Sequence, residues 1–273
     1  MPTIQENLSQ WNNNYDWSQQ GEEWSVWWGG SDMQWYGAIL PRLHRFVPTE
    51  TILEIAPGFG RWTQFLKDLC RNLILVDLSE KCIQACKNRF SPSSHITYYL
   101  NDGKSLEMIS NNSIDCIFSF DSLVHADAEA IKTYLNQMSK KLKKNGIGFL
   151  HHSNIGAYSR YLRLVNKLPR GKSLLQRLKL LDTDAMGRDY SMTAYKFERY
   201  AYEAGLQCIS QELINWGCNR ILTDCISIFT RKDSDWARPN KIVRNKNFMK
   251  EVKTISKLSK LYGATSFKNV TQA

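Results

Sequence analysis

Apolar residues along this chain gather in short runs that alternate with stretches of helical spacing. From residue 50 onwards the short runs have the length of strands. Between them, apolar residues recur every three or four positions, as a helix with one buried face requires. Strands that alternate with helices in this way predict a parallel sheet with helices on both faces. The first five expected strands are Ile52–Ala56, Leu73–Val76, Ile96–Leu100, Ile114–Phe120 and Ile147–His151.

The alternation changes after the fifth expected strand. Residues 153–192 form a basic insertion, with helices expected at Tyr158–Lys167 and Ser173–Leu181. A further helix then leads to two strands, Leu206–Ile214 and Asp224–Thr230, whose loop has the length of a hairpin connection. We therefore predict an α/β fold with a doubly wound, mostly parallel sheet of seven strands, Rossmann-like in type, whose last strand is antiparallel.

Three segments of the chain differ in composition. Residues 1–48 hold six of the nine tryptophans, so we expect a helical cap that packs either over a pocket or on the core. The main domain is predicted to span residues 49–230. Residues 231–273 form a basic tail with 11 basic and three acidic residues, on a chain of net charge +10. The basic insertion and tail indicate an anionic partner or a membrane surface, or else solvated helix faces.

Cysteine usage and the chain's first residues bear on the compartment. The seven cysteines include no Cys-x-x-Cys pair, and several fall inside apolar runs, so buried free thiols are expected. The N-terminal residues are polar, unlike a signal peptide, and no apolar run approaches the ~20 residues of a membrane span. We therefore expect a cytoplasmic protein.

The residues with the most informative chemistry follow the expected strands, where a doubly wound sheet binds its ligands. Gly58 and Gly60 allow a sharp turn and a close approach of the backbone to a ligand. Asp77 ends the second strand, where a carboxylate can accept hydrogen bonds from both hydroxyls of a ribose. Asp102 and Gly103 end the third strand, beside the expected place of an adenine edge. Together they predict a site for a cofactor that contains a nucleoside.

Two further residues separate this site from a nicotinamide dinucleotide site. That site needs a third spaced glycine, and here the position is Thr63. Glu54, at the end of the first strand, makes no favourable interaction with a pyrophosphate, but its carboxylate suits a cationic group. The pattern therefore favours a cofactor with a positively charged end over a dinucleotide.

The stretch from about residue 50 to 152 resembles the class I S-adenosylmethionine-dependent methyltransferases. Glu54-Ile-Ala-Pro-Gly-Phe-Gly60 is similar to the first motif of that family, although Ala56 stands for its first glycine. Asp77 and Asp102-Gly103 match the ribose and adenine motifs, and Ser119–His125 matches the motif after the fourth strand. The resemblance implies S-adenosyl-L-methionine as the cofactor. Its expected binding residues are Glu54, Ala56, Pro57, Gly58, Gly60, Arg61, Trp62, Asp77, Leu78, Asp102, Gly103, Phe120, Trp28 and Trp35.

Methyl transfer to a hydroxyl needs alignment and often the removal of a proton. Histidine suits this role, and His125 and His152 follow strands on the ligand side. We predict these two residues and Asp121 as catalytic candidates, with hydrogen bonds that only support the structure as the other interpretation. His151, Arg188, Asp189 and Tyr190 are candidate acceptor contacts, and the insertion is a candidate acceptor lid. No cluster has convincing spacing for a metal ion.

Four functions remain open from the sequence. The first is O-methylation of a sugar hydroxyl on a glycan, lipid-linked saccharide or nucleotide sugar, because Asp121–His125, His151–Asn154 and the Trp-rich start resemble methyltransferases of glycan and polysaccharide pathways. The second is N- or O-methylation of a small metabolite. The third is a cofactor-binding module without activity, and the intact loop argues against it. The fourth, nucleic-acid methylation, is disfavoured because Phe120-Asp121-Ser122-Leu123 replaces the expected proline motif. Oligomeric state stays open.

Overall fold

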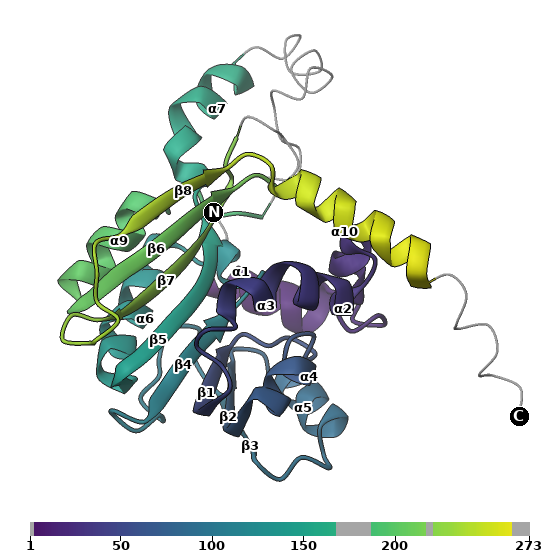
Figure 1. Cartoon of the computed structure of the whole chain (residues 1–273), viewed down its shortest axis with the longest axis vertical. Helices are drawn as coiled ribbons and strands as arrows, with labels where there is room; N and C mark the ends of the chain where they lie inside the picture. Colours follow the sequence, from purple (N-terminus) through teal and green to yellow (C-terminus); the bar gives the residue numbers. More distant parts are fainter. Residues whose placement is uncertain (1–2, 168–186, 217–220, 264–273) are drawn as a thin grey trace, which may run out of the picture.

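The computed structural model describes residues 3–167, 187–216 and 221–263, which contain a single eight-stranded sheet (Figure 1). The strand order is β3-β2-β1-β4-β5-β7-β6-β8. Strands β1 to β5 are parallel, β7 is antiparallel to both of its neighbours, and β8 is parallel to β6. The strands are β1 Thr49–Ile55, β2 Cys70–Asp77, β3 Ile96–Leu100, β4 Ile114–Ser119, β5 Leu142–Ser153, β6 Leu206–Ile214, β7 Asp224–Arg231 and β8 Lys241–Asn245.

Helices cover both faces of the sheet and precede its first strand. The N-terminal segment consists of short elements: α1 Ile4–Ser9, η1 Gln10–Asn14, η2 Glu22–Trp28, α2 Ser31–Gln34, η3 Trp35–Ile39 and α3 Leu40–Leu43. The connections within the sheet carry α4 Thr63–Leu66, η4 Lys67–Leu69, α5 Glu80–Arg89, η5 Leu123–His125, α6 Ala128–Lys141, η6 Ile155–Tyr158, α7 Ser159–Asn166 and α9 Ala194–Glu203. The last described helix is α10 Phe248–Gly263.

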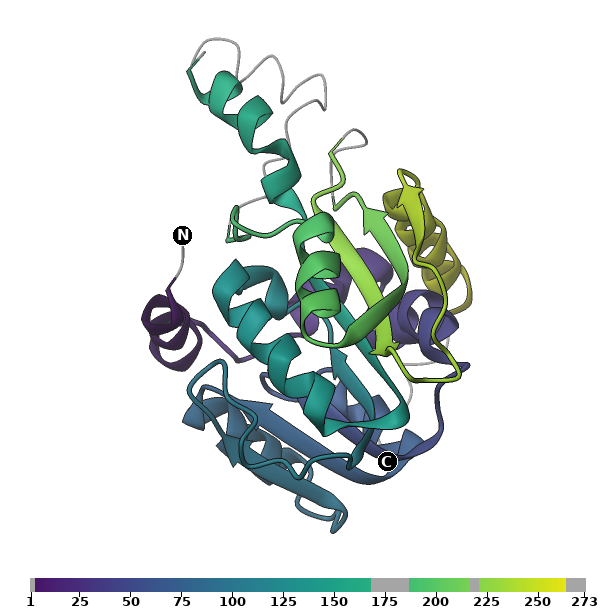
Figure 2. The same ribbon diagram turned by 90° about the vertical axis from the view of Figure 1, so that its left-hand side faces the viewer.

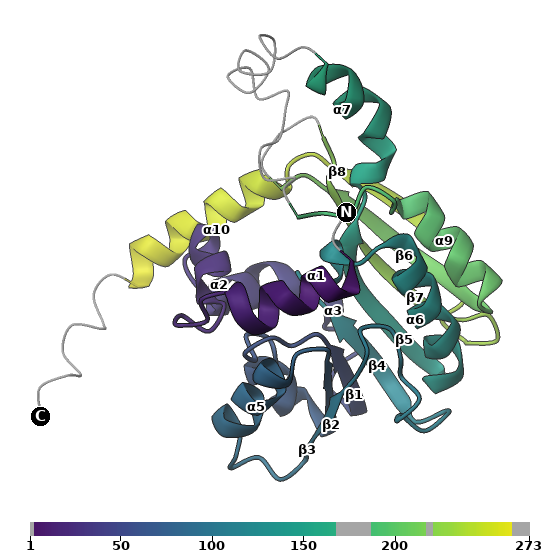
Figure 3. The ribbon, with the colours of Figure 1, turned by 180° about the vertical axis from the view of Figure 1, so that it is seen from behind.

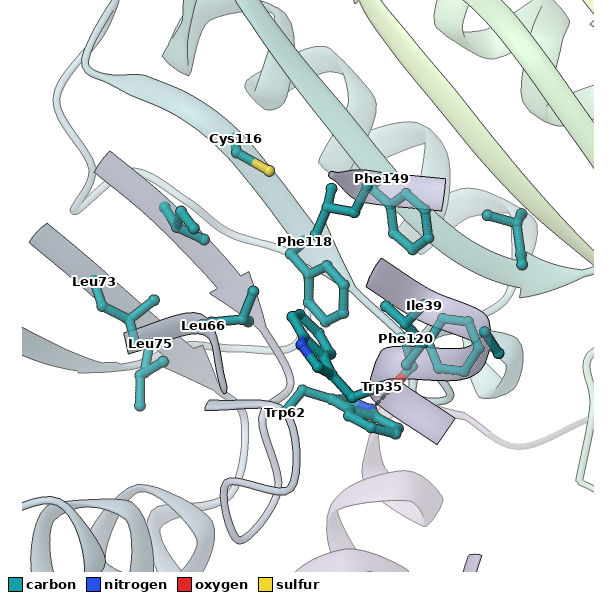
Figure 4. Close-up of a cluster of buried hydrophobic side chains, with 14 of the residues drawn as sticks. Trp35, Ile39, Trp62, Leu66, Leu73, Leu75, Cys116, Phe118, Phe120 and Phe149 are labelled. Atoms are coloured by element: carbon teal, nitrogen blue, oxygen red, sulfur yellow. Dashed lines mark hydrogen bonds between the residues drawn. The ribbon is translucent and has the colours of Figure 1, made fainter. Parts of the chain in front are cut away.

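The core has two layers because alternate strand residues face opposite sides of the sheet. On one side α6 and α9 pack on the strands, as Figure 2 shows. On the other side the N-terminal elements, α4 and α10 enclose an aromatic cluster that includes Trp35, Trp62, Phe118 and Phe149 (Figure 4). The Trp62 indole donates a hydrogen bond to the Phe120 carbonyl at 3.2 Å, which ties this cluster to the end of β4.

The expected alternation of strands and helices is confirmed over the parallel part of the sheet. Strands β3 and β6 have the predicted bounds, and β6 and β7 are antiparallel as the hairpin loop indicated. Ser79 begins α5, where its hydroxyl accepts a hydrogen bond from the Cys82 amide. The apolar residues at helical spacing after Gly60, which end at Leu69, lie on α4 and the short η4 that continues it.

The prediction of seven strands was wrong by one, and the difference lies in the expected tail. Residues 241–245 form β8, which pairs with β6 and extends the sheet. The strand was missed because it is short, basic and at the edge of the sheet, with no apolar alternation. Helix α10 then returns to the N-terminal elements, where Phe248 and Val252 are buried (Figure 1). Residues 241–263 are therefore packed against the rest of the protein, through β8 in the sheet and α10 on the N-terminal elements.

Other expectations fall partly outside the described residues. Six cysteines are described, and all six are free thiols. Helix α7 of the insertion is present, but the helix expected at Ser173–Leu181 lies outside the described residues. Among the residues that the structure describes, no helix is both long and apolar enough to cross a membrane.

Candidate cofactor and acceptor site

A pocket of about 1010 Å³, its open mouth included, lies at the carboxyl ends of β1, β2 and β4. It is formed by the N-terminal elements, the loop after β1, the end of β2, the turn after β3, the loop after β4 and helix α6. The residues that line it include Asn7, Trp11, Trp17, Gln20, Trp24, Ala56, Pro57, Gly58, Phe59, Arg61, Trp62, Asp77, Leu78, Gly103, Phe120, Asp121, His125 and Tyr134.

The loop after β1 (the glycine loop) has backbone angles that require glycine at two positions. Gly58 and Gly60 have φ values of +59° and +85°, in the left-handed region that favours glycine. A Cβ atom on Gly60 would lie 2.4 Å from the Phe90 ring, and one on Gly58 would lie 2.9 Å from the Trp17 ring. Ala56 also adopts a left-handed conformation, at φ +55°. Gly58 thus presents bare backbone to the pocket, as a nucleoside cofactor needs, whereas Gly60 does not line the pocket and its missing Cβ leaves room for Phe90.

Asp77 lies at the end of β2 and lines the pocket beside this loop. Its carboxylate accepts hydrogen bonds from the Gly58 amide at 3.2 Å and the Ser79 amide at 2.8 Å. Burial raises the pKa of this carboxyl group to about 6, and the backbone amides that point at it limit the rise. The carboxylate is therefore fixed in place and mostly ionised at pH 7, as a ligand for ribose hydroxyls should be.

Glu54 is buried behind the loop and does not line the pocket. Its carboxyl group accepts a hydrogen bond from the Thr63 hydroxyl at 2.6 Å. Burial raises the pKa of Glu54 to about 8, although the bond from Thr63 opposes the shift. The expected direct contact with a cationic group is therefore not seen; Glu54 instead connects the strand end to the first turn of α4.

The two residues expected at the adenine edge have different positions. Gly103 lines the pocket with φ +82°. The Asp102 side chain is exposed and accepts hydrogen bonds from the amides of Lys104 and Ser105, at 3.1 and 2.7 Å. Its carboxylate holds a turn, a common use of aspartate after a strand. The prediction that Asp102 itself faces the cofactor finds no support in this arrangement.

The N-terminal elements cover the pocket with aromatic rings. Trp11, Trp17 and Trp24 line it, and their ring centroids lie 5.6 to 6.1 Å apart. The Trp17 ring stacks on Phe59 of the glycine loop at 4.5 Å, and η1 packs beside α5 (Figure 3). The sequence left open whether the N-terminal tryptophans pack over a pocket or on the core. Trp11, Trp17 and Trp24 pack over the pocket.

The tryptophans assigned to the cofactor were the wrong ones. Trp28 is buried against Trp216 and Phe248, and Trp35 stacks on Phe65 with ring centroids 5.0 Å apart. Both belong to the core and neither lines the pocket. Sequence spacing contained no signal that separates them from Trp11, Trp17 and Trp24, because the N-terminal elements are short and change direction between them.

Arg61 and Asp121 form a charged pair on the wall of the pocket. Arg61 Nη2 donates to Asp121 Oδ2 at 2.8 Å, and the side chains are only 5% and 12% exposed. The guanidinium lies over the rings of Trp62 and Trp24, at 4.4 and 5.0 Å from their centroids. Asp121 has a left-handed backbone, with φ +67°. The pair connects the glycine loop to the loop after β4.

His125, at the end of η5, also lines the pocket. Its Nδ1 lies 2.6 Å from the Gly187 carbonyl oxygen, which can only accept, so the ring hydrogen is on Nδ1 and the lone pair is on Nε2. Burial lowers the pKa of His125, although the bond to Gly187 opposes the shift. The imidazole is therefore neutral near pH 7 and has an atom that can accept a proton.

The two histidines of β5 lie outside the pocket. His152 is fully buried on the α9 side, stacks on Phe197 at 4.2 Å, and contacts Ser227 Oγ at 2.8 Å through Nε2. Burial lowers its pKa to about 4. His151 faces the opposite side, where it stacks on Phe120. Neither reaches an acceptor in this arrangement, so the catalytic prediction for His152 is not supported by its position.

The candidate acceptor contacts after the insertion are also mostly internal. Arg188 is buried and paired with Asp224 through two hydrogen bonds. The Asp189 carboxylate accepts hydrogen bonds from the Ser191 amide and hydroxyl. Tyr190 is 43% exposed but does not line the pocket. These three residues therefore support the site from outside it.

The residues around the pocket fit S-adenosylmethionine. The bare backbone at Gly58, the buried acceptor Asp77 and the aromatic cover provide places for a nucleoside and for a small polar end. Among the described residues, no group of three or more His, Cys, Asp or Glu side chains is arranged to hold a metal ion.

Comparison with known proteins agrees with this geometry. Residues 52–146 match the family model described as a methyltransferase domain. Phosphoethanolamine N-methyltransferase 1 of Caenorhabditis elegans is 27% identical over 116 residues, which are 42% of this chain and 23% of that protein. The structure of an S-adenosylmethionine-dependent methyltransferase from Clostridium acetobutylicum has a TM-score of 0.53 at 16% identity, covering 80% of this chain and 96% of that one. The DhpI–SAH complex has a TM-score of 0.54 at 13% identity, covering 84% and 97%.

Residues 52–146 thus match a methyltransferase domain, and the fold of the described chain is similar to that of S-adenosylmethionine-dependent methyltransferases. The structural neighbours show the fold alone. The chain spans about a quarter of the length of the curated relatives that it matches. The resemblance to glycan-pathway enzymes, the cytoplasmic location and the contact with an anionic surface stay predictions.

Proposed function

We propose that this protein transfers a methyl group from S-adenosylmethionine to a hydroxyl group of a saccharide acceptor. The observation that carries the proposal is the position of His125, whose imidazole lines the same pocket as the glycine loop and Asp77. When bound, S-adenosylmethionine supplies an activated methyl group on a positively charged sulfur. The chain must then bind and align the acceptor, and must accept the proton that its hydroxyl loses.

His125 supplies the base in this proposal. Its hydrogen is held on Nδ1 by the Gly187 carbonyl, so Nε2 is the atom that accepts the proton from a hydroxyl. The lowered pKa keeps the ring neutral at pH 7, and protonation below the ordinary value near 6.5 removes the base. Turnover is therefore expected to hold from pH 8 down to about 6.5 and to fall at lower pH.

The composition of the pocket wall supports a saccharide as the acceptor. Trp11 and Trp24 offer flat apolar rings, and Asn7, Gln20 and Asp127 offer polar groups in the same pocket. A sugar ring has apolar faces and hydroxyl edges, so it matches a lining that combines aromatic rings with a few hydrogen-bonding groups.

An amine of a small metabolite is the second candidate acceptor. It is favoured by the similarity to a phosphoethanolamine N-methyltransferase, and by the tryptophan rings, which attract cations as well as sugars. A neutral amine has its own lone pair and needs no base at the moment of transfer. The two candidates therefore differ in how much they depend on His125.

The first experiment tests cofactor binding and acceptor class with the full chain. Calorimetry with S-adenosylmethionine should give a dissociation constant in the micromolar range, and absence of binding would overturn the proposal. Nucleotide sugars, short glycans and small amines are then incubated with cofactor labelled in its methyl group. Label on a saccharide supports the proposal, and label only on amines replaces it with the second candidate.

The second experiment removes the proposed base. His125→Gln should lower turnover on a hydroxyl acceptor about 100-fold or more, the usual contribution of general base catalysis. Affinity for S-adenosylhomocysteine should change less than about threefold. His44→Gln is the matched control, since His44 is exposed and outside the pocket. Equal turnover of both variants would remove His125 from the mechanism.

A further inference from the structure

Behind the pocket lies a buried polar network that the proposed methyl transfer does not use. Asp121, on the pocket wall, donates its backbone N–H to His151 Nδ1 at 3.1 Å. His151 Nε2 lies 3.3 Å from Asp224 Oδ2, and both side chains are fully buried. Because the Asp121 amide can only donate, the lone pair of His151 is on Nδ1 and its hydrogen is on Nε2, facing the carboxylate.

Arg188 completes the network from the far side. Its Nε and Nη2 donate to the two oxygens of Asp224 at 2.6 and 2.8 Å. Burial raises the pKa of Asp224, but the Arg188 charge, the Arg188 hydrogen bonds and the adjacent His151 outweigh burial and hold this pKa well below its usual range. His151 Nε2 is a close neighbour of Asp224 Oδ2 without the alignment of a hydrogen bond. Asp224 is therefore a permanent acceptor, and it selects the ring hydrogen position of His151.

The backbone on either side of Arg188 contacts the loop after β4 as well. The Gly187 carbonyl accepts the hydrogen bond from His125 Nδ1, and the Asp189 amide donates to the Val124 carbonyl at 3.1 Å. Residues 187–189 thus reach both polar side chains of the pocket wall, His125 directly and Asp121 through Asp224 and His151.

Asp121 needs such support because its backbone is strained. A left-handed conformation is unfavourable for an L-residue, although less so for aspartate than for most, and Asp121 has φ +67°. Its carboxylate also holds Arg61 over Trp62 and Trp24. A change in the hydrogen bond to its amide is therefore expected to move Asp121 and Arg61 together, and to change the shape of the pocket.

We propose that Arg188, Asp224 and His151 are positioning residues of the cofactor pocket, which fix the Asp121 backbone through the ring hydrogen position of His151. None of the three lines the pocket, so none is a catalytic residue. Stability alone is a poor explanation for the arrangement, since buried ion pairs seldom stabilise a fold more than apolar residues of similar size. The inference rests on the proposed function, because the pocket is the one assigned there to S-adenosylmethionine.

The first test measures the ring hydrogen position in the unmodified protein. Nitrogen-15 NMR of histidine-labelled protein should show His151 with an unprotonated Nδ1 and a protonated Nε2, and the signal is assigned by its loss in His151→Asn. A protonated Nδ1 at pH 7 would overturn the inference. This measurement needs no acceptor and no altered fold.

The second test is a cycle of variants with S-adenosylhomocysteine as the probe. Asp224→Asn removes the charge and one of the two oxygens that accept from Arg188. With the remaining oxygen on Arg188 Nε, the NH₂ group takes the place of Oδ2, beside both Arg188 Nη2 and His151, and favours a hydrogen on Nδ1, against the Asp121 amide. The dissociation constant should rise about tenfold, which corresponds to about 1.4 kcal/mol. Replacement of the triad aspartate of a serine protease by asparagine lowers kcat about 10⁴-fold through the same kind of change in the ring hydrogen position.

The variant His151→Asn separates positioning from packing. The shorter side chain of this variant places an amide oxygen near the position of Nδ1, so the Asp121 amide keeps an acceptor that does not depend on Asp224. Binding should stay within about threefold of the unmodified protein, and Asp224→Asn should add less than about twofold in this background. Full additivity of the two changes would contradict the inference.

A matched control uses a partly buried arginine pair at β6, Arg42 with Glu212. Arg42 donates to both oxygens of Glu212, at 2.6 and 2.8 Å, away from the pocket. Glu212→Gln should lower the melting temperature and leave the probe affinity unchanged. A rise in the dissociation constant equal to that of Asp224→Asn would mean that general destabilisation explains both. Failure of the unmodified protein to bind the probe would instead contradict the proposed function.

Discussion

The two sides of the cofactor pocket are built in different ways. The wall consists of loops that follow β1, β2 and β4, and their backbones are fixed by the parallel sheet. The cover consists of residues 4–24, where short helices place tryptophan rings over the glycine loop. The wall provides specific polar atoms such as Asp77, while the cover provides apolar area. Affinity for the cofactor should therefore depend sharply on single residues of the wall and more gradually on residues of the cover.

The largest expected effect is on stability and concerns α10, which packs against the N-terminal elements on the side away from the pocket. Phe248 of α10 is buried and lies 6.1 Å from Trp28 of η2, centroid to centroid. Phe248→Ala should lower the free energy of unfolding by about 3–5 kcal/mol, because it removes a buried ring and leaves a cavity. Urea denaturation measures this. Leu261→Ala, an exposed change on the same helix, should stay within about 0.5 kcal/mol. Equal effects would mean that α10 does not support the cover.

The next effect tests the wall. Asp77→Ala removes a buried carboxylate that is fixed by the amides of Gly58 and Ser79, and it should weaken S-adenosylmethionine binding about 100-fold, the loss of one or two hydrogen bonds to a charged group. Calorimetry gives the affinity. Asp68→Ala is the control, since Asp68 is exposed and outside the pocket. A loss below about fivefold would show that the wall does not bind through Asp77.

A smaller effect is expected on the cover. Trp17→Ala removes the ring that stacks on Phe59, and it should weaken binding of S-adenosylhomocysteine about tenfold through lost apolar contact. Trp27→Ala is a close control, because Trp27 lies in the same N-terminal segment but is 71% exposed. Identical affinities of the two variants would contradict the assignment of the cover to Trp17.

The smallest effect concerns Glu54, the buried acid behind the pocket wall, and depends on pH. The pKa of Glu54 is raised to about 8 from an unfolded value near 4.5, so the folded state holds a proton that the unfolded state has lost. This stabilisation is complete below pH 4.5 and is lost as pH rises through 8, by about 1 kcal/mol per pH unit. Glu54→Gln should flatten the decline between pH 7 and 8, as measured by urea denaturation. An unchanged slope would indicate that Glu54 is ionised in the folded protein.

Local sequence patterns were sufficient to predict most of the pocket wall. The strands, the glycine loop and Asp77 lie in continuous segments, and parallel strand ends meet at one edge of a sheet whatever the rest of the fold does. Asp102 was the exception. Its carboxylate accepts bonds from two amides in its own turn, and that competition between local and ligand contacts is not visible in a motif.

The cover and the support behind the wall were less predictable. Trp11, Trp17 and Trp24 were recognised as part of a dense cluster but were not chosen over Trp28 and Trp35, because a chain of short turns has no single period from which to derive a face. The edge strand β8 was missed for a similar reason. Its residues are polar and exposed, and only pairing with β6 makes them a strand.

The amino-acid sequence by itself determined the order of strands and helices, the glycine loop and Asp77, and with them the type of cofactor. Tertiary structure decided which of the histidines after the strands faces the pocket. His151 and His152 are neighbours on one strand, so their side chains point to opposite faces, and both faces of this strand are covered. His125 reaches the pocket because η5 turns it inward and Gly187, distant in sequence, holds its ring. Such contacts between distant segments exist only after the chain has folded.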